Sequence, residues 1–272
     1  MNFIHMSDPH IRVTPLPPPA SDFPAEKIVD DGRRLRAALR RAKSHSPSPD
    51  FFVFSGDLVH EGEAADYAYL RSLLDEELAG TPYFTALGNH DRHAAFWEGF
   101  WGRRGADAPY FACALLNGLR VITLDTSPTD GCTRGALSDE QLDFLRTTLK
   151  TPAPLGSILV MHHPVSVCGG AYDHILLQDR YGLSRMIQGG DIRAVLTGHA
   201  HFTRFGAVSG VLCATAAGTA FCIDPTDAER MVFLSASSYL YGHLSAQEII
   251  MGAVDMELDK TRLFSRGIRV ES

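Results

Sequence analysis

Short apolar runs alternate with amphipathic segments along the first two hundred residues. Five of the runs are four or five residues long, which predicts strands buried on both faces. They cover residues 3–6, 51–54, 83–87, 158–161 and 192–196. Residues 28–44 and 64–78 instead space their leucines as in a helix packed on a sheet. Five prolines within residues 14–24 exclude a helix or a central strand there and predict a loop.

The pattern changes from residue 110 onward. Segments 110–115 and 119–124 flank Asn117-Gly118, a pair that favours the positive φ angles of a hairpin turn. Ser138 and Gln141 have the spacing of a capping box at the start of a helix. A further helix is expected near residues 181–188. This mixture predicts an α/β (α+β) fold, a four-layer αββα sandwich of two mixed sheets with flanking helices, rather than one doubly wound sheet.

The signal weakens after about residue 216. Residues 221–234 contain Pro225 and scattered charges, and Ser245-Ala246-Gln247-Glu248 predicts the start of a helix. We therefore expect a main domain over residues 1–215. Residues 216–272 are expected to form a small C-terminal cap or a segment through which a homo-oligomer assembles.

Composition limits the partners. The 272 residues include 25 Lys plus Arg against 32 Asp plus Glu, a net charge of -7, so no diffuse positive field attracts long nucleic acid. Bound cations could still supply local positive charge for an anionic substrate. The five cysteines include no C-x-x-C pair, which predicts reduced thiols in a cytoplasmic protein. Neither a signal peptide nor a membrane span is expected, since no run of about 18 apolar residues occurs.

Metal-ligand residue types follow each of the five predicted buried strands. Asp8 and His10 are expected to share one face of an extended strand end, because residues i and i+2 point the same way. The other clusters are Gly56-Asp57, Gly88-Asn89-His90-Asp91, His162-His163 and Gly198-His199-Ala200-His201. Carboxylates, an amide and imidazoles delivered to one edge suit a metal centre with mixed oxygen and nitrogen ligands, which favours hydrolytic chemistry.

This series of clusters, in full order over about residues 1–205, resembles the calcineurin-like metallophosphoesterase superfamily. Gly56-Asp57-Leu58-Val59, followed by Gly62, Tyr67, Leu70 and Leu74, is similar to bacterial class III cyclic nucleotide phosphodiesterases and related glycerophosphodiesterases. The resemblance implies two divalent metal ions, compatible with Fe, Mn, Zn or Co. By position, it assigns Asp8, His10 and His201 to the first ion, Asn89, His162 and His199 to the second, and Asp57 to both.

The resemblance also implies roles next to the ions. His90 would face the substrate, stabilising charge or protonating the leaving oxygen, and Asp91 would fix the tautomer of His90. Alternatively, Asp91 caps a helix over residues 92–100. His162 is preferred to His163 as a ligand because it directly follows its strand. Further candidates for substrate contact are His163, His93 and His243, and for stacking on a base Phe96, Trp97 and Tyr172, although a helical Phe-Trp pair is more often core.

The resemblance implies hydrolysis of small phosphodiesters by in-line attack of a hydroxide generated at the metals. Cyclic nucleotides, 3',5' or 2',3', are the first candidates and glycerophosphodiesters the second, with a broader phosphomono- and diesterase also open. A purple acid phosphatase would carry tyrosine three residues after Asp57, where this chain has His60. A protein Ser/Thr phosphatase would show arginines in these motifs. A non-catalytic metal-bound scaffold would be expected to have lost ligands, and none of the seven is missing.

Overall fold

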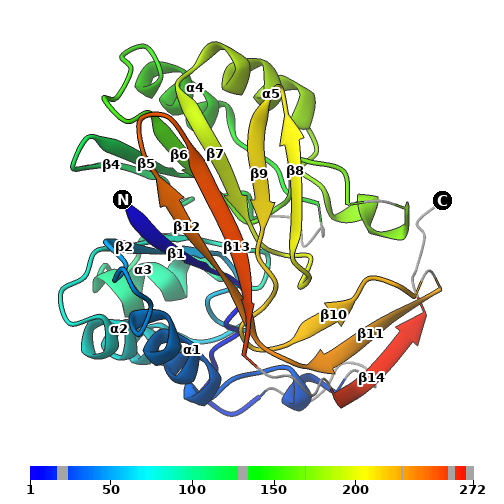
Figure 1. The fold of residues 1–272 in the computed structure, drawn as a ribbon. Coiled ribbons are helices and arrows are strands. Elements are labelled where there is room, and N and C mark those ends of the chain that lie inside the picture. The colour runs from blue at the N-terminus through cyan, green and yellow to red at the C-terminus, as the bar shows by residue number, and fades with distance from the viewer. Residues whose placement is uncertain (17–23, 128–133, 169, 228, 257–260, 268–272) are drawn as a thin grey trace.

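Two large sheets lie face to face, and helices cover their outer faces (Figure 1). The computed structural model describes residues 1–16, 24–127, 134–168, 170–227, 229–256 and 261–267. The strand order is β13-β12-β1-β2-β3 in one sheet and β4-β5-β6-β7-β9-β8 in the other. The predicted four-layer αββα sandwich is confirmed. No helix among the described residues is long and apolar enough to span a membrane.

The first sheet has a parallel centre. β1 pairs in parallel with β2, and β2 with β3, whereas β12 runs antiparallel to β1. Its strands are β1 (Asn2–Met6), β2 (Phe51–Ser55), β3 (Tyr83–Ala86), β12 (Ser238–Leu244) and β13 (Ile249–Asp255). The carboxyl ends of β1, β2 and β3 therefore lie at one edge, as parallel strands require.

The second sheet is parallel from β5 to β9 and carries an antiparallel strand at each edge. Asn117 and Gly118 join β4 to β5 with φ angles of 49° and 90°, so the predicted hairpin is confirmed. Its strands are β4 (Ala112–Leu116), β5 (Leu119–Thr123), β6 (Ser157–Val160), β7 (Ile192–Thr197), β8 (Arg204–Val208) and β9 (Val211–Thr215).

Apolar side chains fill the space between the two sheets. Phe3, Phe51 and Val53 of the first sheet pack with Ile158 and Val160 of the second, and all five are fully buried. The alternate residues of β1 and β2, Ile4, Met6, Phe52 and Phe54, instead pack with the helices on the outer face of the first sheet. The apolar runs are continuous because both faces of these strands are dry.

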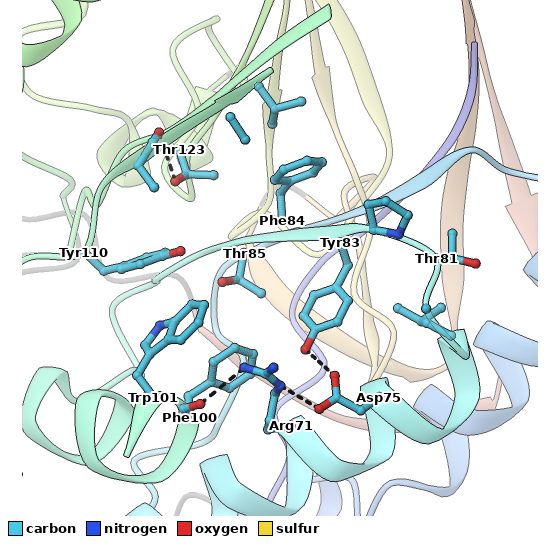
Figure 2. A pocket seen from close by; sticks show the side chains of 16 residues that line it. Arg71, Asp75, Thr81, Tyr83, Phe84, Thr85, Phe100, Trp101, Tyr110 and Thr123 are labelled. Atoms are coloured by element: carbon cyan, nitrogen blue, oxygen red, sulfur yellow. Dashed lines mark hydrogen bonds and ion pairs between the residues drawn. The ribbon is translucent and has the colours of Figure 1, made fainter. Parts of the chain in front are cut away.

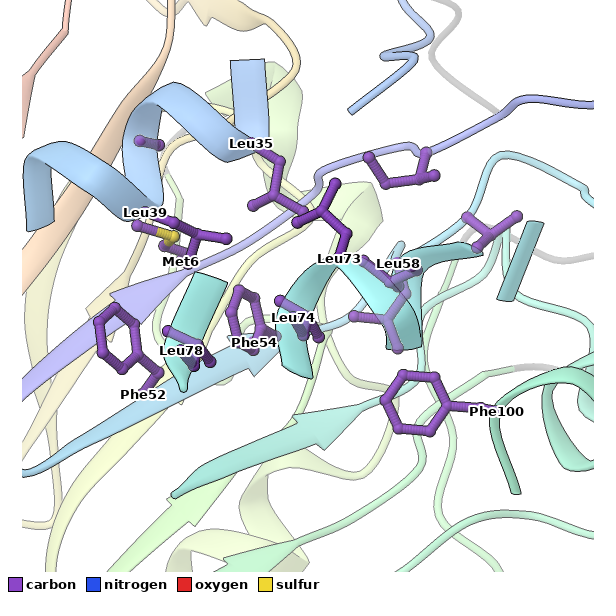
Figure 3. Packing of buried hydrophobic residues seen from close by; sticks show 14 of the residues in the cluster. Met6, Leu35, Leu39, Phe52, Phe54, Leu58, Leu73, Leu74, Leu78 and Phe100 are labelled. Atoms are coloured by element: carbon purple, nitrogen blue, oxygen red, sulfur yellow. The ribbon is translucent and has the colours of Figure 1, made fainter. Parts of the chain in front are cut away.

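Three helices cover the first sheet and two cover the second. Leu35 and Leu39 of α1 and Leu74 and Leu78 of α2 belong to one buried cluster with Met6, Phe52 and Phe54 of the first sheet (Figure 3). The helices are α1 (Arg33–Lys43), α2 (Ala64–Leu78), α3 (His93–Trp101), α4 (Asp139–Thr148) and α5 (Arg180–Gly189), with 3-10 turns η1 (Ala25–Lys27) and η2 (Gly170–Ile175). The predicted helices over 64–78 and near 181–188 are confirmed.

Helix α1 begins later than the leucine spacing predicts. Gly32 has a φ of 95°, which interrupts the helical conformation. Asp30 accepts hydrogen bonds from the backbone N–H groups of Arg34 and Leu35, so the first turn is capped at that point. The prediction was therefore wrong for residues 28–32. Residues 17–23 of the proline-rich segment lie outside the described residues.

The cap of α4 is only half as predicted. Ser138 Oγ accepts a hydrogen bond from Gln141 N, which confirms the N-cap. The Gln141 side chain does not return to Ser138. It accepts from Asp125 N and donates to Asp125 O, both at 2.8 Å, and so ties the helix to the chain end of β5.

The C-terminal segment divides into two parts. β12 and β13 complete the first sheet, and the predicted helix start at residue 245 is wrong. Ser245 Oγ accepts hydrogen bonds from Gln247 N and Glu248 N in the turn between these two strands. The rest forms a separate antiparallel sheet of β10 (Cys222–Asp224), β11 (Arg230–Ser235) and β14 (Thr261–Gly267) (Figure 1). No disulfide joins the four cysteines that are described, and Cys132 lies outside them.

Candidate metal centre

The seven predicted metal ligands come together at the carboxyl ends of five parallel strands. One group consists of Asp8, His10, Asp57 and His201, and a second of Asp57, His162 and His199. Within each group the ligand atoms lie within 4.8 Å of one another. Asn89, the seventh residue, follows β3 and borders the second group.

Short distances connect the first group. His201 Nε2 lies 3.2 Å from Asp8 Oδ1 and 3.4 Å from His10 Nε2. His10 Nε2 lies 3.7 Å from Asp57 Oδ2. All four residues are buried. The two imidazole nitrogens and two carboxylate oxygens thus face one small space.

The second group is equally tight. His162 Nε2 lies 3.1 Å from His199 Nδ1, 3.2 Å from Asn89 Oδ1 and 3.3 Å from Asp57 Oδ2. The same oxygen of Asp57 therefore faces both groups. A single carboxylate in this position can hold two cations next to each other.

The loops that carry these ligands are not extended. Asp8 and His10 have φ angles of 51° and 43°, so the expected strand-like alternation does not explain why both face the site. Non-glycine residues in the left-handed region each cost about 1 to 3 kcal/mol and gather at functional sites. Three further ligands share this conformation, namely Asp57, His199 and His201.

Two motif glycines are required by close packing. A Cβ atom on Gly88 would lie 2.3 Å from Asp57 Oδ1, and one on Gly56 would lie 2.5 Å from His162 Nδ1. Both distances are far inside contact distance. The glycines before Asp57 and Asn89 therefore let the ligand loops approach one another.

Backbone hydrogen bonds orient the ligand side chains. His162 Nδ1 donates to Ser55 O at 2.8 Å, and His201 Nδ1 donates to Phe221 O at 3.1 Å. A carbonyl oxygen can only accept, so in a neutral ring the Nε2 atoms are left with lone pairs toward the site. Asp57 Oδ1 accepts from His90 N at 2.9 Å, which directs Oδ2 inward.

The electrostatics of the site favour a cation. Burial opposes ionisation of Asp57, but the nearby His162 and His90 outweigh it and hold the pKa of Asp57 well below its usual value. Asp8 Oδ1 is buried and accepts no hydrogen bond from any residue that the structure describes. A divalent cation would satisfy this oxygen and the facing imidazole nitrogens. The mixed donor set fits Fe, Mn, Zn or Co.

His90 lies beside the two ligand groups and lines the cavity next to them. Its ring lies 5.1 Å from the ring of His10, and His90 Nδ1 lies 3.6 Å from Glu61 Oε1. Burial opposes protonation of His90, but the charges of Asp57 and Glu61 outweigh it and raise the pKa of His90. Glu61 was not predicted from the sequence as a partner of His90. Its position four residues after Asp57 does not indicate that the side chain points toward His90.

Asp91 has neither role expected for it. Its carboxylate accepts hydrogen bonds from the backbone of Leu58, Val59 and Gly88 and from Tyr67 Oη. Helix α3 has Arg92 at its N-cap and no side-chain cap, so the capping prediction is wrong. The carboxylate next to His90 is Glu61, so the tautomer role is not borne out for Asp91 either. Burial, with the charge of Asp57, raises the pKa of Asp91 to about 7.

The other candidate histidines lie in different surroundings. His163 Nδ1 bonds Thr126 Oγ1 at 2.8 Å, whereas the ligand groups include His162. His93 pairs with the buried Asp125 at 2.8 Å. His243 bonds Asn2 at the start of β1. The candidate ligands follow the other end of β1, so His243 lies too far away to contact a substrate bound at them.

A cavity of about 340 Å³ opens on the ligand groups. One wall is polar and includes His10, Asp57, Asn89 and His90. Apolar side chains from the small C-terminal sheet and nearby turns form another part of the lining, namely Ile28, Tyr172, Ile175, Phe221, Ile223, Met231 and Phe233. No lysine or arginine among the described residues lines it. Of the stacking candidates, Tyr172 borders this cavity, whereas Phe96 is fully buried in the core.

A larger cavity, of about 510 Å³, lies between the edge strands β3 and β4 (Figure 2). Arg71 fills part of it, 5.3 Å from the ring of Phe100 and 5.4 Å from that of Trp101, and bonds Asp75. None of the seven ligands lines it. The candidate chemistry therefore belongs to the smaller cavity.

Some known proteins are similar to this chain in sequence, and others are similar in fold. A probable cyclic nucleotide phosphodiesterase of Rhodococcus erythropolis is 34% identical over 224 residues, which are 81% of this chain and 71% of that protein. A cAMP/cGMP dual specificity phosphodiesterase of Mycobacterium tuberculosis is 34% identical over 227 residues, 82% of this chain and 69% of that protein. The crystal structure of a dimetal phosphatase from Danio rerio superposes with a TM-score of 0.59 at 13% identity, covering 92% of this chain and 98% of that one.

A family model described as calcineurin-like phosphoesterase matches residues 1–202. This range contains β1 to β7 and all seven candidate ligands. The resemblance seen in the order of the motifs is thereby confirmed, and the chain belongs to the calcineurin-like phosphoesterase family.

Proposed function

We propose that this chain is a phosphodiesterase that uses two divalent cations to hydrolyse small phosphodiesters, with cyclic nucleotides as the first candidates. The observation that carries the proposal is the position of Asp57 Oδ2, 3.7 Å from His10 Nε2 and 3.3 Å from His162 Nε2. One carboxylate oxygen thus serves two ligand groups at once. The named activities of the relatives at 34% identity support the same reaction.

The ligands divide between the two cations. Asp8, His10 and His201 would hold one, Asn89, His162 and His199 the other, and Asp57 both. Bound here, the cations would supply a water of lowered pKa and polarise the phosphoryl oxygens. Asn89 is a neutral ligand, so the second cation keeps more of its charge for the substrate.

His90 is placed to handle the leaving oxygen. It borders the cavity next to the ligand groups, and the charges of Asp57 and Glu61 outweigh burial and raise the pKa of His90. A protonated imidazole can stabilise developing charge or donate that proton to the leaving oxygen. Glu61 would keep the ring oriented and charged.

The apolar wall favours a diester with a flat apolar group. Tyr172, Phe221 and Phe233 line the cavity beside the candidate ligands, and Phe221 stacks on the ring of His201 with centroids 3.9 Å apart. Because no lysine or arginine among the described residues lines the cavity, the cations carry the task of binding charge. A diester carries one negative charge on its phosphate, and a nucleobase would lie on the aromatic side. The polar glycerol group of a glycerophosphodiester would instead lie against these apolar side chains.

The test is hydrolysis by purified protein loaded with Mn²⁺ or with Fe²⁺ and Zn²⁺. A generic aryl phosphodiester comes first, followed by 3',5'-cyclic AMP, 2',3'-cyclic AMP and glycerophosphoethanolamine on one metallated sample. We expect turnover of the aryl ester and preference for a cyclic nucleotide. No turnover with any metal, together with an Asp57→Ala variant that binds as much metal as wild type, would refute the proposal.

A further inference from the structure

His60 lies behind a candidate ligand without belonging to either ligand group. Its Nδ1 atom is 3.0 Å from Nδ1 of His10, and the side chain is buried. The other nitrogen of His10, Nε2, faces Asp57 and His201 at 3.7 and 3.4 Å. The ring of His10 therefore has the candidate cation site on one side and His60 on the other.

A hydrogen bond between His10 Nδ1 and His60 Nδ1 requires a proton on one of the two nitrogens and a lone pair on the other. When His10 binds a cation through Nε2, the neutral ring carries its proton on Nδ1. His10 is then the donor and His60 Nδ1 the acceptor. His60 in turn must carry its own proton on Nε2.

The surrounding loop holds His60 in this position. His60 N donates to Ile11 O at 3.2 Å, and Arg12 Nη1 donates to His60 O at 2.8 Å. The ring also stacks on His90, with centroids 4.7 Å apart and planes 23° from parallel. Backbone and ring are both constrained, so the acceptor stays aimed at His10.

The candidate ligands His10, His162 and His201 differ in the group that faces their Nδ1 atom. His162 donates to Ser55 O and His201 donates to Phe221 O, both carbonyl oxygens. His10 alone among these three has an imidazole nitrogen as its partner. The hydrogen-bond partner of a metal-bound imidazole fixes its tautomer and influences its basicity.

We propose that His60 is a positioning residue that sets the tautomer of His10 and thereby controls the affinity of the site for the cation held by Asp8, His10 and His201. The proposal rests on the two-cation site proposed above. His60 touches neither substrate nor cation. It acts through His10, and a neutral acceptor there makes His10 a weaker ligand than a carboxylate acceptor would.

Four variants separate the hydrogen bond from the packing. His60→Phe keeps a ring for the stack on His90 and removes the acceptor, and His60→Ala removes both. His60→Asn restores an acceptor, because Asn Oδ1 and His Nδ1 are the same number of bonds from Cα. His60→Asp makes that acceptor a carboxylate. The matched control is His5→Phe, which replaces a buried imidazole that bonds Ser55 Oγ and no candidate ligand.

The measurements are the number of bound Mn²⁺ or Zn²⁺ ions by elemental analysis and their affinities by competition with a chelator. His60→Phe and His60→Ala should each weaken one of the two ions about 10- to 100-fold and leave the other unchanged. His60→Asn should recover most of this loss, and His60→Asp should bind that ion at least as tightly as wild type. His5→Phe should keep both affinities.

Two results with the variants would overturn the proposal. One is wild-type affinity for both ions in His60→Phe, and the other is an equal loss in His60→Phe and His5→Phe. If the wild-type protein binds two cations but hydrolyses no diester, the proposed function is refuted. The role of His60 is not, because the cation affinities of the variants still test it. Wild type that binds no cation overturns both.

Discussion

The first sheet and the second sheet supply different ligand chemistry to the same site. Loops after β1, β2 and β3 bring every oxygen ligand, Asp8, Asp57 and Asn89, with one imidazole, His10. Loops after β6 and β7 bring only imidazoles, which are His162, His199 and His201. The charge of the site therefore comes from one sheet, and most of the neutral donors come from the other.

Hydrogen bonds within each half and between the halves hold the site together. In the first sheet the loops bind each other, with Asp8 N donating to Gly56 O at 3.1 Å and His10 N to Asp57 O at 3.0 Å. The loops of the second sheet reach across to the first, with His199 N donating to Asp8 Oδ2 and His162 Nδ1 to Ser55 O. The loops of the second sheet also bind each other, with Gly198 N donating to His162 O at 2.9 Å, and Ser127 Oγ donates across to Gly88 O at 2.7 Å. Each half is thus held both by its own loops and by bonds across the sandwich.

The largest effect is expected where the two halves meet. Asp57→Ala should lose both cations and lower diester hydrolysis by at least about 10²- to 10³-fold. His162→Ala, on the imidazole side, should lose only one, since Asp8, His10, Asp57 and His201 remain. Elemental analysis after gel filtration, combined with the hydrolysis rate, distinguishes the two. Two retained ions in Asp57→Ala would contradict a shared carboxylate.

His90 tests the substrate side separately from both halves. His90→Ala should lower kcat by about 10²- to 10⁴-fold with the metal content unchanged, because the ring handles the leaving oxygen and holds no cation. Glu61→Gln, which keeps the shape and removes the charge, should lower kcat less. Steady-state kinetics and elemental analysis on the same samples check this. Loss of a cation in His90→Ala would move His90 into the ligand set.

Gly88 tests the packing of the oxygen half. Gly88→Ala places a Cβ atom 2.3 Å from Asp57 Oδ1, and such overpacking costs about 1 to 3 kcal/mol of the free energy of unfolding. The matched control is Gly189→Ala at the end of α5, where a Cβ meets nothing within 4 Å. Chemical denaturation should show the loss in Gly88→Ala only, together with weaker metal binding. Equal stability of the two variants would show that the Gly88 loop can shift.

Local patterns predicted the strands and the clusters of ligand-type residues at their ends because both depend on neighbouring residues, whereas the family resemblance assigned the candidate ligands within those clusters. A run such as residues 51–54 followed by Gly56-Asp57 indicates a buried strand and the residue at its end without any distant contact. The directions of side chains beyond the strand ends were not predictable in this way. They follow from positive φ angles at Asp8 and Asp57, which strand geometry does not anticipate.

The remaining misses depend on contacts between distant segments. Ser245 accepts hydrogen bonds from residues two and three positions on, as a helix N-cap or a turn equally would. β12 pairs with β1, which lies more than 230 residues away in the chain, and this pairing favours a turn over a helix at Ser245. Similarly, the predicted helix cap at Asp91 is wrong because its carboxylate accepts hydrogen bonds from Leu58 N and Val59 N, more than 30 residues earlier in the chain.

The smallest predicted effect concerns a buried histidine in the sheet that carries the oxygens. His5 bonds Ser55 Oγ, and burial lowers its pKa to about 3 against the opposing charge of Asp8. An unfolded histidine has a pKa of about 6.5, so the stabilisation from neutral His5 is full above that pH and is lost as pH falls toward 3. Wild type should lose about 2 kcal/mol more than His5→Phe between pH 7 and pH 5. Urea denaturation of metal-free protein at several pH values measures this difference, since the site histidines titrate alike in both. Parallel pH dependence in the two proteins would mean that His5 becomes hydrated and charged within the folded sheet.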